Sequence, residues 1–529
     1  MLTLVIEYEI KFYYTFKASV NAYLSVGFGR IIEKAVNMTL NTELMHVRSL
    51  SVIAGVVLRV TSIVGATLLM PALIGLIYGE TYEAMVFLYV GLLTLSLSLA
   101  IGYLFRPPRS ITIAEALVIS GISWIVVAFI GGIPYVYTIG MSWVDAFFES
   151  MSGFTTTGMT LIKVIEVVPR SVLFWRALTQ WLGGAGIVML FLIFITIPSG
   201  GGISLWRLYV AEARDVRIKP STWETVKSIW IIYLGLTVAC ILTLKFLGVS
   251  WFDSIAHAFT ALATGGFSTK TASIAAFNNP AVEMALAFFS FAGGINFLAH
   301  YILIVRGPKA FFKYYEVKAA ILIVLASTAL ISLDVIGRMG IDPINALRYA
   351  VFQSISIMTT TGYTTININT LPSLSKFILL TLMFIGGNLC STGGAIKVGR
   401  IVASVKIMIN QLQQPFLPSG AIKPVKIGTQ ILKEDDILRL FMFIMTYLIG
   451  IVVGTAVLTA FGYDPFQSLS AVASAQGNVG PCYLDLFKLN DVCRVLLALH
   501  MWLGRLELIP AITLLMPTSW RVVLRKRVE

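Results

Sequence analysis

Charge is scarce in this sequence, and so are the residues that carry most enzyme chemistry. Only 12% of the 529 residues are charged, and the chain has four histidines and four cysteines. The cysteines show no C-x-x-C spacing, which argues against a zinc site or a disulfide framework. The sequence also lacks H-E-x-x-H, G-x-S-x-G and G-x-G-D motifs, and no G-x-G-x-x-G follows a strand. It therefore predicts neither an enzyme nor a chain that binds a nucleotide or another organic cofactor.

Apolar side chains are abundant instead. Hydrophobic residues make up 57% of the chain and the mean hydropathy is +0.86, which is more apolar surface than soluble cores can bury. Apolar runs long enough to cross a hydrocarbon layer about 30 Å thick recur along the whole chain. No segment resembles a separate soluble domain. The predicted spans cover residues 52–79, 84–105, 111–138, 172–197, 226–248, 281–305, 318–337, 374–409, 437–461 and 492–516.

The distribution of the net charge of +13 indicates membrane topology rather than nucleic-acid binding. Loops rich in lysine and arginine alternate with loops that carry acidic residues. By the positive-inside rule, the basic loops and both termini are cytoplasmic and the acidic loops are external, in a cell-membrane protein. The basic set comprises Arg106 and Arg109, then Arg207, Arg214, Arg217 and Lys219, then Arg306, Lys309, Lys313 and Lys318, then residues 400–439 and 521–527. The acidic set comprises Glu80, Glu83, Asp145, Asp253 and Asp464.

Residues 1–50 do not follow this pattern. The stretch 8–34 is mixed in polarity and lacks the n-region, h-region and cleavage site of a signal peptide. A second possible start, Met45, lies just before the first apolar span. The sequence fits either a cytoplasmic surface segment or an over-extended start, and it predicts no function there.

A fourfold internal repeat determines the predicted fold. Four segments share one order: an apolar span, a short amphipathic stretch, a Thr/Gly cluster and a second apolar span. The clusters are residues 154–160, 263–269, 358–364 and 476–481, and they align on Gly158, Gly266, Gly362 and Gly480. A second landmark keeps the same register further downstream, at residues 182–184, 292–294, 385–387 and 503–505.

The stretches before the clusters are too short to cross a bilayer. Residues 143–152 and 251–262 make about three helical turns. Asp145 and Asp253 lie near their first residues, where a carboxylate caps or offsets a helix N-terminus. We expect re-entrant pore helices whose C-terminal ends, with partial negative charge, favour a cation.

Threonine and glycine suit a loop that binds a cation at membrane depth. Irregular backbone is tolerated there only where it lines water or is buried in protein. Glycine permits positive φ, carbonyls can then replace an ion's hydration shell, and threonine hydroxyls add oxygens. A single T-T-G could be an ordinary turn, but four in register favour a selectivity filter. The predicted cation-binding residues are Thr156, Thr157, Gly158, Thr264, Gly265, Gly266, Thr360, Thr361, Gly362, Asn478, Val479 and Gly480.

The predicted fold is therefore an all-α polytopic membrane protein. Four parallel pseudo-repeats of helix, re-entrant pore helix, filter loop and helix surround a central pore, with two extra N-terminal transmembrane helices. The predicted divisions are the N-terminal segment 1–50, the two extra helices 51–108, and the repeats 109–221, 222–314, 315–432 and 433–529.

Three further runs carry a resemblance to a known family. They are WLGGAG at 181–186, GGNLCSTGGAIK at 386–397 and LGRLE at 503–507. Together with the four clusters and the two extra spans, they resemble the TrkH, KtrB and HKT superfamily of K⁺ transporters, and TrkH-type proteins most. The resemblance covers residues 46–520.

The resemblance implies K⁺ uptake across the cytoplasmic membrane. Glycine at all four filter positions goes with K⁺ preference in this family, whereas serine in the first repeat goes with Na⁺. The second and fourth clusters depart from T-T-G, so looser selectivity is expected. Two alternatives remain open: a poorly selective K⁺/Na⁺ channel, and a secondary transporter coupled to Na⁺ or H⁺, against which the parallel repeats and the scarcity of acidic residues in the spans argue.

The resemblance also implies a gate formed by an intramembrane loop at residues 386–397. Glycine weakens a helix and Ser391 and Thr392 can bond to nearby backbone, which suits such a loop. The alternative is glycines that only permit close helix packing. Arg505 aligns with glycines of the other repeats and is predicted to be an electrostatic barrier below the filter, or alternatively an arginine snorkelling to the interface. The predicted gate residues are Gly386, Gly387, Ser391, Thr392, Gly393, Gly394, Lys397 and Arg505.

Partners are likewise implied by the resemblance. TrkH-type proteins form homodimers and bind cytosolic nucleotide-sensing subunits of the TrkA type. The basic stretches 207–219 and 400–433 are candidate docking surfaces, and they are equally suited to lipid headgroups.

Overall fold

The computed structural model describes residues 50–103, 105, 113–196, 222–418, 424–428, 430–517 and 520. The uninterpreted segment 1–49 and the basic positions Arg106, Arg109, 207–219 and 521–527 lie outside the described residues.

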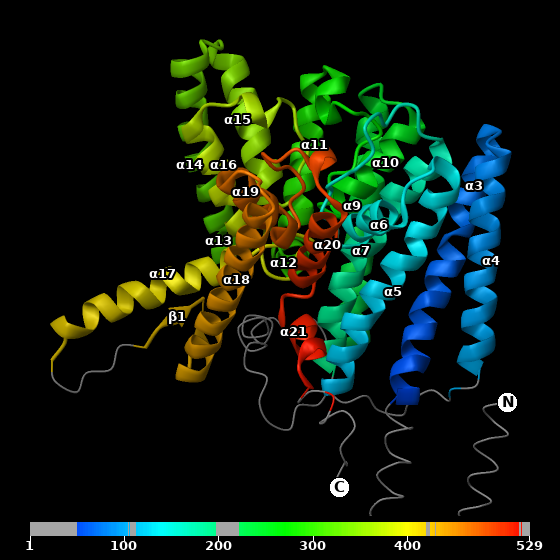
Figure 1. The fold of residues 1–529 in the computed structure, drawn as a ribbon. Coiled ribbons are helices and arrows are strands. Elements are labelled where there is room, and N and C mark those ends of the chain that lie inside the picture. Colours follow the sequence, from blue (N-terminus) through cyan, green and yellow to red (C-terminus); the bar gives the residue numbers. More distant parts are fainter. Residues whose placement is uncertain are drawn as a thin grey trace, which may run out of the picture.

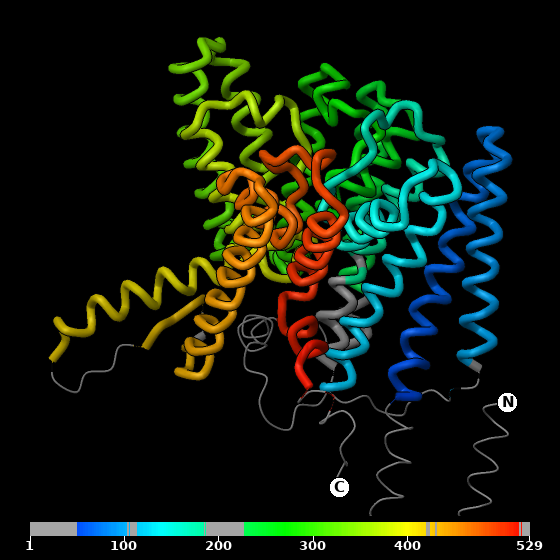
Figure 2. Tube along the Cα trace, in the orientation of Figure 1, coloured from blue at the N-terminus to red at the C-terminus, as the bar shows by residue number. Residues whose placement is uncertain are grey.

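The described chain is a bundle of long helices around four short ones (Figure 1). A hairpin comes first, formed by the helix Leu50–Tyr78, whose last part is α3 (Leu69–Tyr78), and by α4 (Thr81–Tyr103). It turns at Gly79, which has a φ of 77°. Figure 2 shows this hairpin at one edge of the bundle, beside α5 (Ile113–Ile139). The other unbroken long helices are α7 (Arg170–Thr196), α9 (Thr222–Phe246), α14 (Tyr315–Met339) and α18 (Glu434–Ala460).

The hairpin is tied to the rest of the bundle by Glu80. Its carboxylate accepts hydrogen bonds from the backbone N–H groups of Arg170, at 2.6 Å, and Ser171, at 2.9 Å. These are the first N–H groups of α7, which have no partner within the helix. Glu80 therefore caps a helix that lies far from it in the sequence.

Six single helices among the described residues are long and apolar enough to cross a membrane, judged by length and composition. A further candidate span is the pair α11 (Pro280–Gly294) and α12 (Phe297–Arg306), which is bent by 98°. Most predicted spans correspond to these helices within a few residues.

Four short helices have their C-terminal halves buried in the bundle. They are α6 (Trp143–Phe154), α10 (Trp251–Leu262), α15 (Pro343–Met358) and α19 (Pro465–Gly477). Each begins with a side-chain cap, because an oxygen of Ser142, Ser250, Asp342 or Asp464 accepts a bond from a first-turn N–H. In α6 and α10 the serine is thus the cap, and Asp145 and Asp253 occupy the first turn.

Three helices that follow the short helices are broken. The predicted interruption at 386–397 separates α16 (Ser373–Ile385) from α17 (Val398–Gln413). The continuous spans predicted at 281–305 and 492–516 were wrong, because α11 ends at Gly294 and α20 (Asp491–Arg505) ends before α21 (Ile509–Leu515). Asn296 caps α12 through Leu298 N, so a glycine pair followed by asparagine was the signal that could have located the first break.

The remaining elements are short. They are the helix α13 (Pro308–Lys313), the 3₁₀ turns η1 (Ser273–Phe277), η2 (Ile368–Thr370), η3 (Gln414–Phe416) and η4 (Leu486–Lys488), and an antiparallel pair of strands, β1 (Lys426–Ile427) and β2 (Gln430–Ile431). Figure 1 shows α17 projecting away from the bundle beside β1.

Candidate functional site

The four Thr/Gly loops, residues 154–160, 263–269, 358–364 and 476–481, share one backbone pattern. Two residues with positive φ are separated by one other residue. Threonine rarely adopts positive φ because its branched side chain makes this conformation costly. Such strain persists only where the surroundings impose it, and it gathers at functional sites. The φ values are 55° at Thr156 and 86° at Gly158, 50° at Thr264 and 76° at Gly266, 59° at Thr360 and 80° at Gly362, and 54° at Asn478 and 106° at Gly480.

The loops contact one another in a closed cycle. Each aligned glycine lies so close to a carbonyl oxygen of the next loop that a Cβ atom would collide with it. That Cβ would lie 2.2 Å from Gly265 O at Gly158, 1.9 Å from Thr361 O at Gly266, 2.0 Å from Val479 O at Gly362 and 2.7 Å from Thr157 O at Gly480. All twelve residues predicted to bind K⁺ thus belong to one ring of backbone.

The first and third loops are held by the same contacts within their own segments. Ser152 donates a hydrogen bond to Met159 O at 2.6 Å, and Ser356 donates one to Tyr363 O at 2.7 Å. The hydroxyls of each threonine pair, Thr155 with Thr157 and Thr359 with Thr361, are 2.8 Å apart. In the fourth loop, Asn478 Nδ2 instead donates to Thr157 Oγ1 at 3.0 Å and to Met501 O at 2.9 Å.

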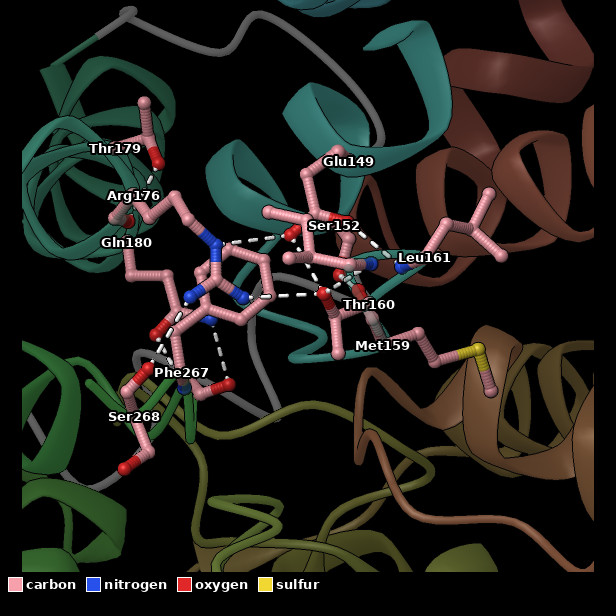
Figure 3. Close-up of polar contacts among 12 residues, drawn as sticks. Glu149, Ser152, Met159, Thr160, Leu161, Arg176, Thr179, Gln180, Phe267 and Ser268 are labelled. Carbon is pink, nitrogen blue, oxygen red and sulfur yellow. Dashed lines mark hydrogen bonds and ion pairs between the residues drawn. The ribbon is translucent and has the colours of Figure 1, made fainter. Parts of the chain in front are cut away.

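A buried ion pair lies behind the first and second loops (Figure 3). Arg176 Nε lies 2.9 Å from Glu149 Oε1, and both side chains are almost fully buried. Glu149 also accepts bonds from Thr160 Oγ1 and Leu161 N, just after the first loop. Charge buried in this way is costly unless it is fully paired, as it is here. The sequence analysis missed this pair, although an arginine inside an apolar span was a usable signal.

The interrupting segment, residues 386–397, lies directly against the loops. Gly394 N donates to Thr360 Oγ1 at 2.9 Å, and Thr392 Oγ1 donates to Gly293 O at 2.9 Å and to Leu262 O at 3.0 Å. Ser391 bonds to nearby backbone as expected, at 2.6 Å from Asn388 O. Of the predicted gate residues of this segment, Gly394 and Thr392 thus contact the third and second loops, at Thr360 and Thr264.

Arg505 joins this segment to α7. Its side chain is 2% exposed, with Nη1 donating to Thr392 O at 2.8 Å and Nη2 to Gly183 O at 2.7 Å. Glu507 instead pairs with Lys397 at 3.1 Å and Arg400 at 2.5 Å.

Ion pairs also connect helices that are far apart in the sequence, near the N-terminal ends of two of the short helices. Arg494 of α20 lies 2.8 Å from Asp145 of α6, and Arg348 of α15 lies 2.6 Å from Glu283 of α11. The sequence analysis missed both pairs because the partners are far apart in the chain.

The chemistry available in the site is that of neutral oxygens. Among the described residues, no group of three or more His, Cys, Asp or Glu side chains could hold a metal ion. Away from the spanning helices, hydrogen bonds from the side chain and backbone of Thr271 hold the pKa of Glu166 below its usual range. This contact joins the segments that follow the first and second loops.

Comparisons with known proteins agree on one family. The family model TrkH, described as cation transport protein, matches residues 84–521. The chain is 32% identical over 495 residues to the Trk system potassium uptake protein TrkH of Salmonella typhimurium strain LT2, covering 90% of this chain and 100% of that protein. It is 31% identical over 457 residues to an uncharacterised cation transporter of Methanocaldococcus jannaschii, covering 86% of this chain and 93% of that protein.

A solved structure is similar over nearly the same length. The crystal structure of the potassium transporter TrkH from Vibrio parahaemolyticus superimposes with a TM-score of 0.81 at 31% identity, covering 89% of this chain and 99% of that one. With its apolar spanning helices, this chain is a multi-pass membrane protein and belongs to the TrkH family of cation transport proteins.

Proposed function

We propose that this protein takes up K⁺ across the cytoplasmic membrane through a selectivity filter formed by the four Thr/Gly loops. The observation that carries the proposal is the closed cycle of contacts between aligned glycines and carbonyl oxygens. A ring of carbonyls can replace the hydration shell of a monovalent cation. The potassium uptake named for the Salmonella relative supports K⁺ as the substrate.

The short helices supply the electrostatics in this proposal. They act as pore helices, each reaching its Thr/Gly loop at its C-terminal end, where the helix dipole favours a cation. The surrounding contacts impose the positive φ values of the loops, and this backbone conformation orients the carbonyls before an ion arrives. The predicted pseudo-repeats, from 109–221 to 433–529, each contribute one pore helix and one loop.

The interrupting segment acts as the gate. Hydrogen bonds from Gly394 to Thr360 and from Arg505 to Thr392 hold it against the loops. Movement of the segment would open the path to the cytoplasm. This gives Arg505 a holding role, in addition to any electrostatic barrier that it presents to cations.

Assembly and regulation complete the proposal. The chain works as a homodimer with its basic loops and termini in the cytoplasm, and nucleotide sensing belongs to cytosolic TrkA-type subunits. The described part of the basic stretch 400–433 includes α17, whose projection from the bundle suits a docking surface (Figure 1).

Uptake of ⁸⁶Rb⁺ into liposomes that contain the purified protein tests the function. We expect uptake under an outward K⁺ gradient that competing K⁺ suppresses strongly and Na⁺ weakly. No uptake, with or without the cytosolic subunit, would refute the proposal. Uptake that requires a Na⁺ or H⁺ gradient would instead indicate a coupled secondary transporter, and equal competition by Na⁺ would indicate a poorly selective channel.

A further inference from the structure

The second Thr/Gly loop lacks the hydroxyl contact that holds the first and third loops. Those loops use Ser152 and Ser356, each six residues before the aligned glycine. The corresponding residue of the second segment is Thr260, and its hydroxyl is bonded to the hydroxyl of Tyr363 instead. Its own helix α10 holds only the end of the loop, where His257 Nε2 lies 3.0 Å from Ser268 Oγ and Thr269 Oγ1 donates to Asp253 Oδ1 at 2.6 Å. Side-chain contacts to the backbone around Gly266 come from another part of the molecule.

Gln180 of α7 provides the missing contacts from the preceding repeat. Its Nε2 donates a hydrogen bond to Gly265 O at 2.7 Å, and its Oε1 accepts one from Phe267 N at 3.0 Å. The side chain is fully buried. One helical turn earlier, Arg176 Nη1 donates to Ser268 O at 3.2 Å (Figure 3). Two side chains of one helix thus hold a loop that belongs to the next repeat.

The amide of Gln180 also occupies the space that a side chain at position 265 would need. A Cβ atom on Gly265 would lie 2.4 Å from both Cδ and Oε1 of Gln180. The backbone of Gly265 has no positive φ, so its conformation would tolerate a side chain. Gln180 is therefore what excludes one. The other loops carry Thr157, Thr361 and Val479 at this place in the sequence.

We propose that Gln180 is a specificity-determining residue, which positions the second loop and replaces the side chain that the T-G-G sequence lacks. Gln180 and Gly265 are in this view a compensating pair. The inference rests on the proposed function, because specificity here means discrimination between K⁺ and Na⁺ at the ring of loops.

One oxygen of the ring consequently differs from the other three. Gly265 O accepts the bond from Gln180, whereas no donor among the described residues reaches the corresponding oxygens of Thr157, Thr361 and Val479. A carbonyl that already accepts one bond has a lone pair left for an ion. The bond fixes the direction of this carbonyl, which the other loops achieve through contacts of their own.

A glutamine-to-leucine substitution tests the role of the amide. Gln180→Leu replaces the polar amide with an apolar side chain and so removes both hydrogen bonds. We expect the preference for ⁸⁶Rb⁺ over Na⁺ in liposome uptake to fall about tenfold. The net free energy that one hydrogen bond contributes corresponds to roughly this change in discrimination. Ser327→Ala is the control, since Ser327 is buried in α14, outside the loops and the short helices, and bonds only to Ile323 O and Val324 O of its own helix among the residues described. Wild-type discrimination in Gln180→Leu, at any uptake rate, overturns the proposal.

A compensating double variant covers the case in which the single variants fold poorly. Ser290 precedes Gly293 as Gln180 precedes Gly183, and the loop that follows in the chain carries Thr361. The variant Gln180→Ser/Gly265→Thr copies that combination. We expect Gly265→Thr alone to lose at least about nine-tenths of uptake, and the double variant to regain several-fold of it. Equal uptake per amount of folded protein in the single and double variants overturns the pairing. Wild-type protein without uptake would refute the proposed function itself, which is a separate result.

Discussion

Gly158 and Gly362 combine a left-handed backbone with a close approach to a neighbouring carbonyl. A side chain at either position would meet backbone oxygen near 2 Å, at 2.2 Å from Gly265 O and 2.0 Å from Val479 O. Positive φ adds about 1–2 kcal/mol for a residue with a Cβ atom. The carbonyl ring would have to shift to accept alanine.

We therefore expect Gly158→Ala and Gly362→Ala to reduce discrimination between K⁺ and Na⁺ by about tenfold or more, because about 1.4 kcal/mol corresponds to a tenfold change. Competition of Na⁺ against ⁸⁶Rb⁺ uptake in liposomes measures this. Gly235→Ala is a suitable control, since nothing lies within 4 Å of a Cβ there. Unchanged selectivity in both variants would remove these glycines from the filter.

Arg505 is the second residue with a distinct prediction. Its guanidinium is bonded to Thr392 O and Gly183 O, so it fastens the interrupting segment to α7. Bonds to a charged donor contribute about 1.5–3 kcal/mol. We expect Arg505→Ala to raise K⁺ flux with selectivity kept, measured as the initial rate of ⁸⁶Rb⁺ uptake. A folded Arg505→Ala protein with wild-type or lower flux would count against both the barrier and the holding role.

At the scale of elements, the segment between α16 and α17 is a non-helical connection rather than part of a continuous helix. Its middle residues bond to Thr360 and pack under the loops. Deleting residues 393–396 should raise basal flux and reduce dependence on the cytosolic subunit, because less of the segment remains to fill the space below the ring. Flux with and without that subunit measures this, and selectivity serves as the internal control. Wild-type flux and regulation would show that the segment only packs.

At the scale of the whole molecule, an ion pair joins two helices that are far apart in the sequence. Arg494 and Asp145 are 2.8 Å apart and only 17% and 22% exposed, and they link α20 to α6. A double-mutant cycle with Arg494→Gln and Asp145→Asn should give a coupling free energy of about 0.5–1 kcal/mol in thermal unfolding in detergent.

The control for this cycle is the pair Lys488 and Asp485, which is 80% and 47% exposed and lies within one repeat. Its coupling free energy should be near zero, because solvent screens it. Equal coupling free energies in the two pairs would contradict a special role for the contact between α20 and α6.

Local sequence determined the elements of this protein. Apolar runs fix membrane-spanning helices because their side chains have no other place to be buried, and the comparisons confirmed the TrkH resemblance drawn from short runs. The interruption at 386–397 was expected from the TrkH resemblance, and its glycine, serine and threonine residues suit a break in a helix. The break at 295–296 left a weaker local signal and was missed.

Only the tertiary structure decided how the elements support one another. Gln180 and Gly265 are separated by many residues, as are Arg176 and Ser268, and neither pair has a periodicity that links them. Such contacts depend on the packing of whole helices, which brings a side chain of one helix to the backbone of a distant loop. The sequence alone predicted which loops bind a cation, and the packing determined which side chains hold those loops in place.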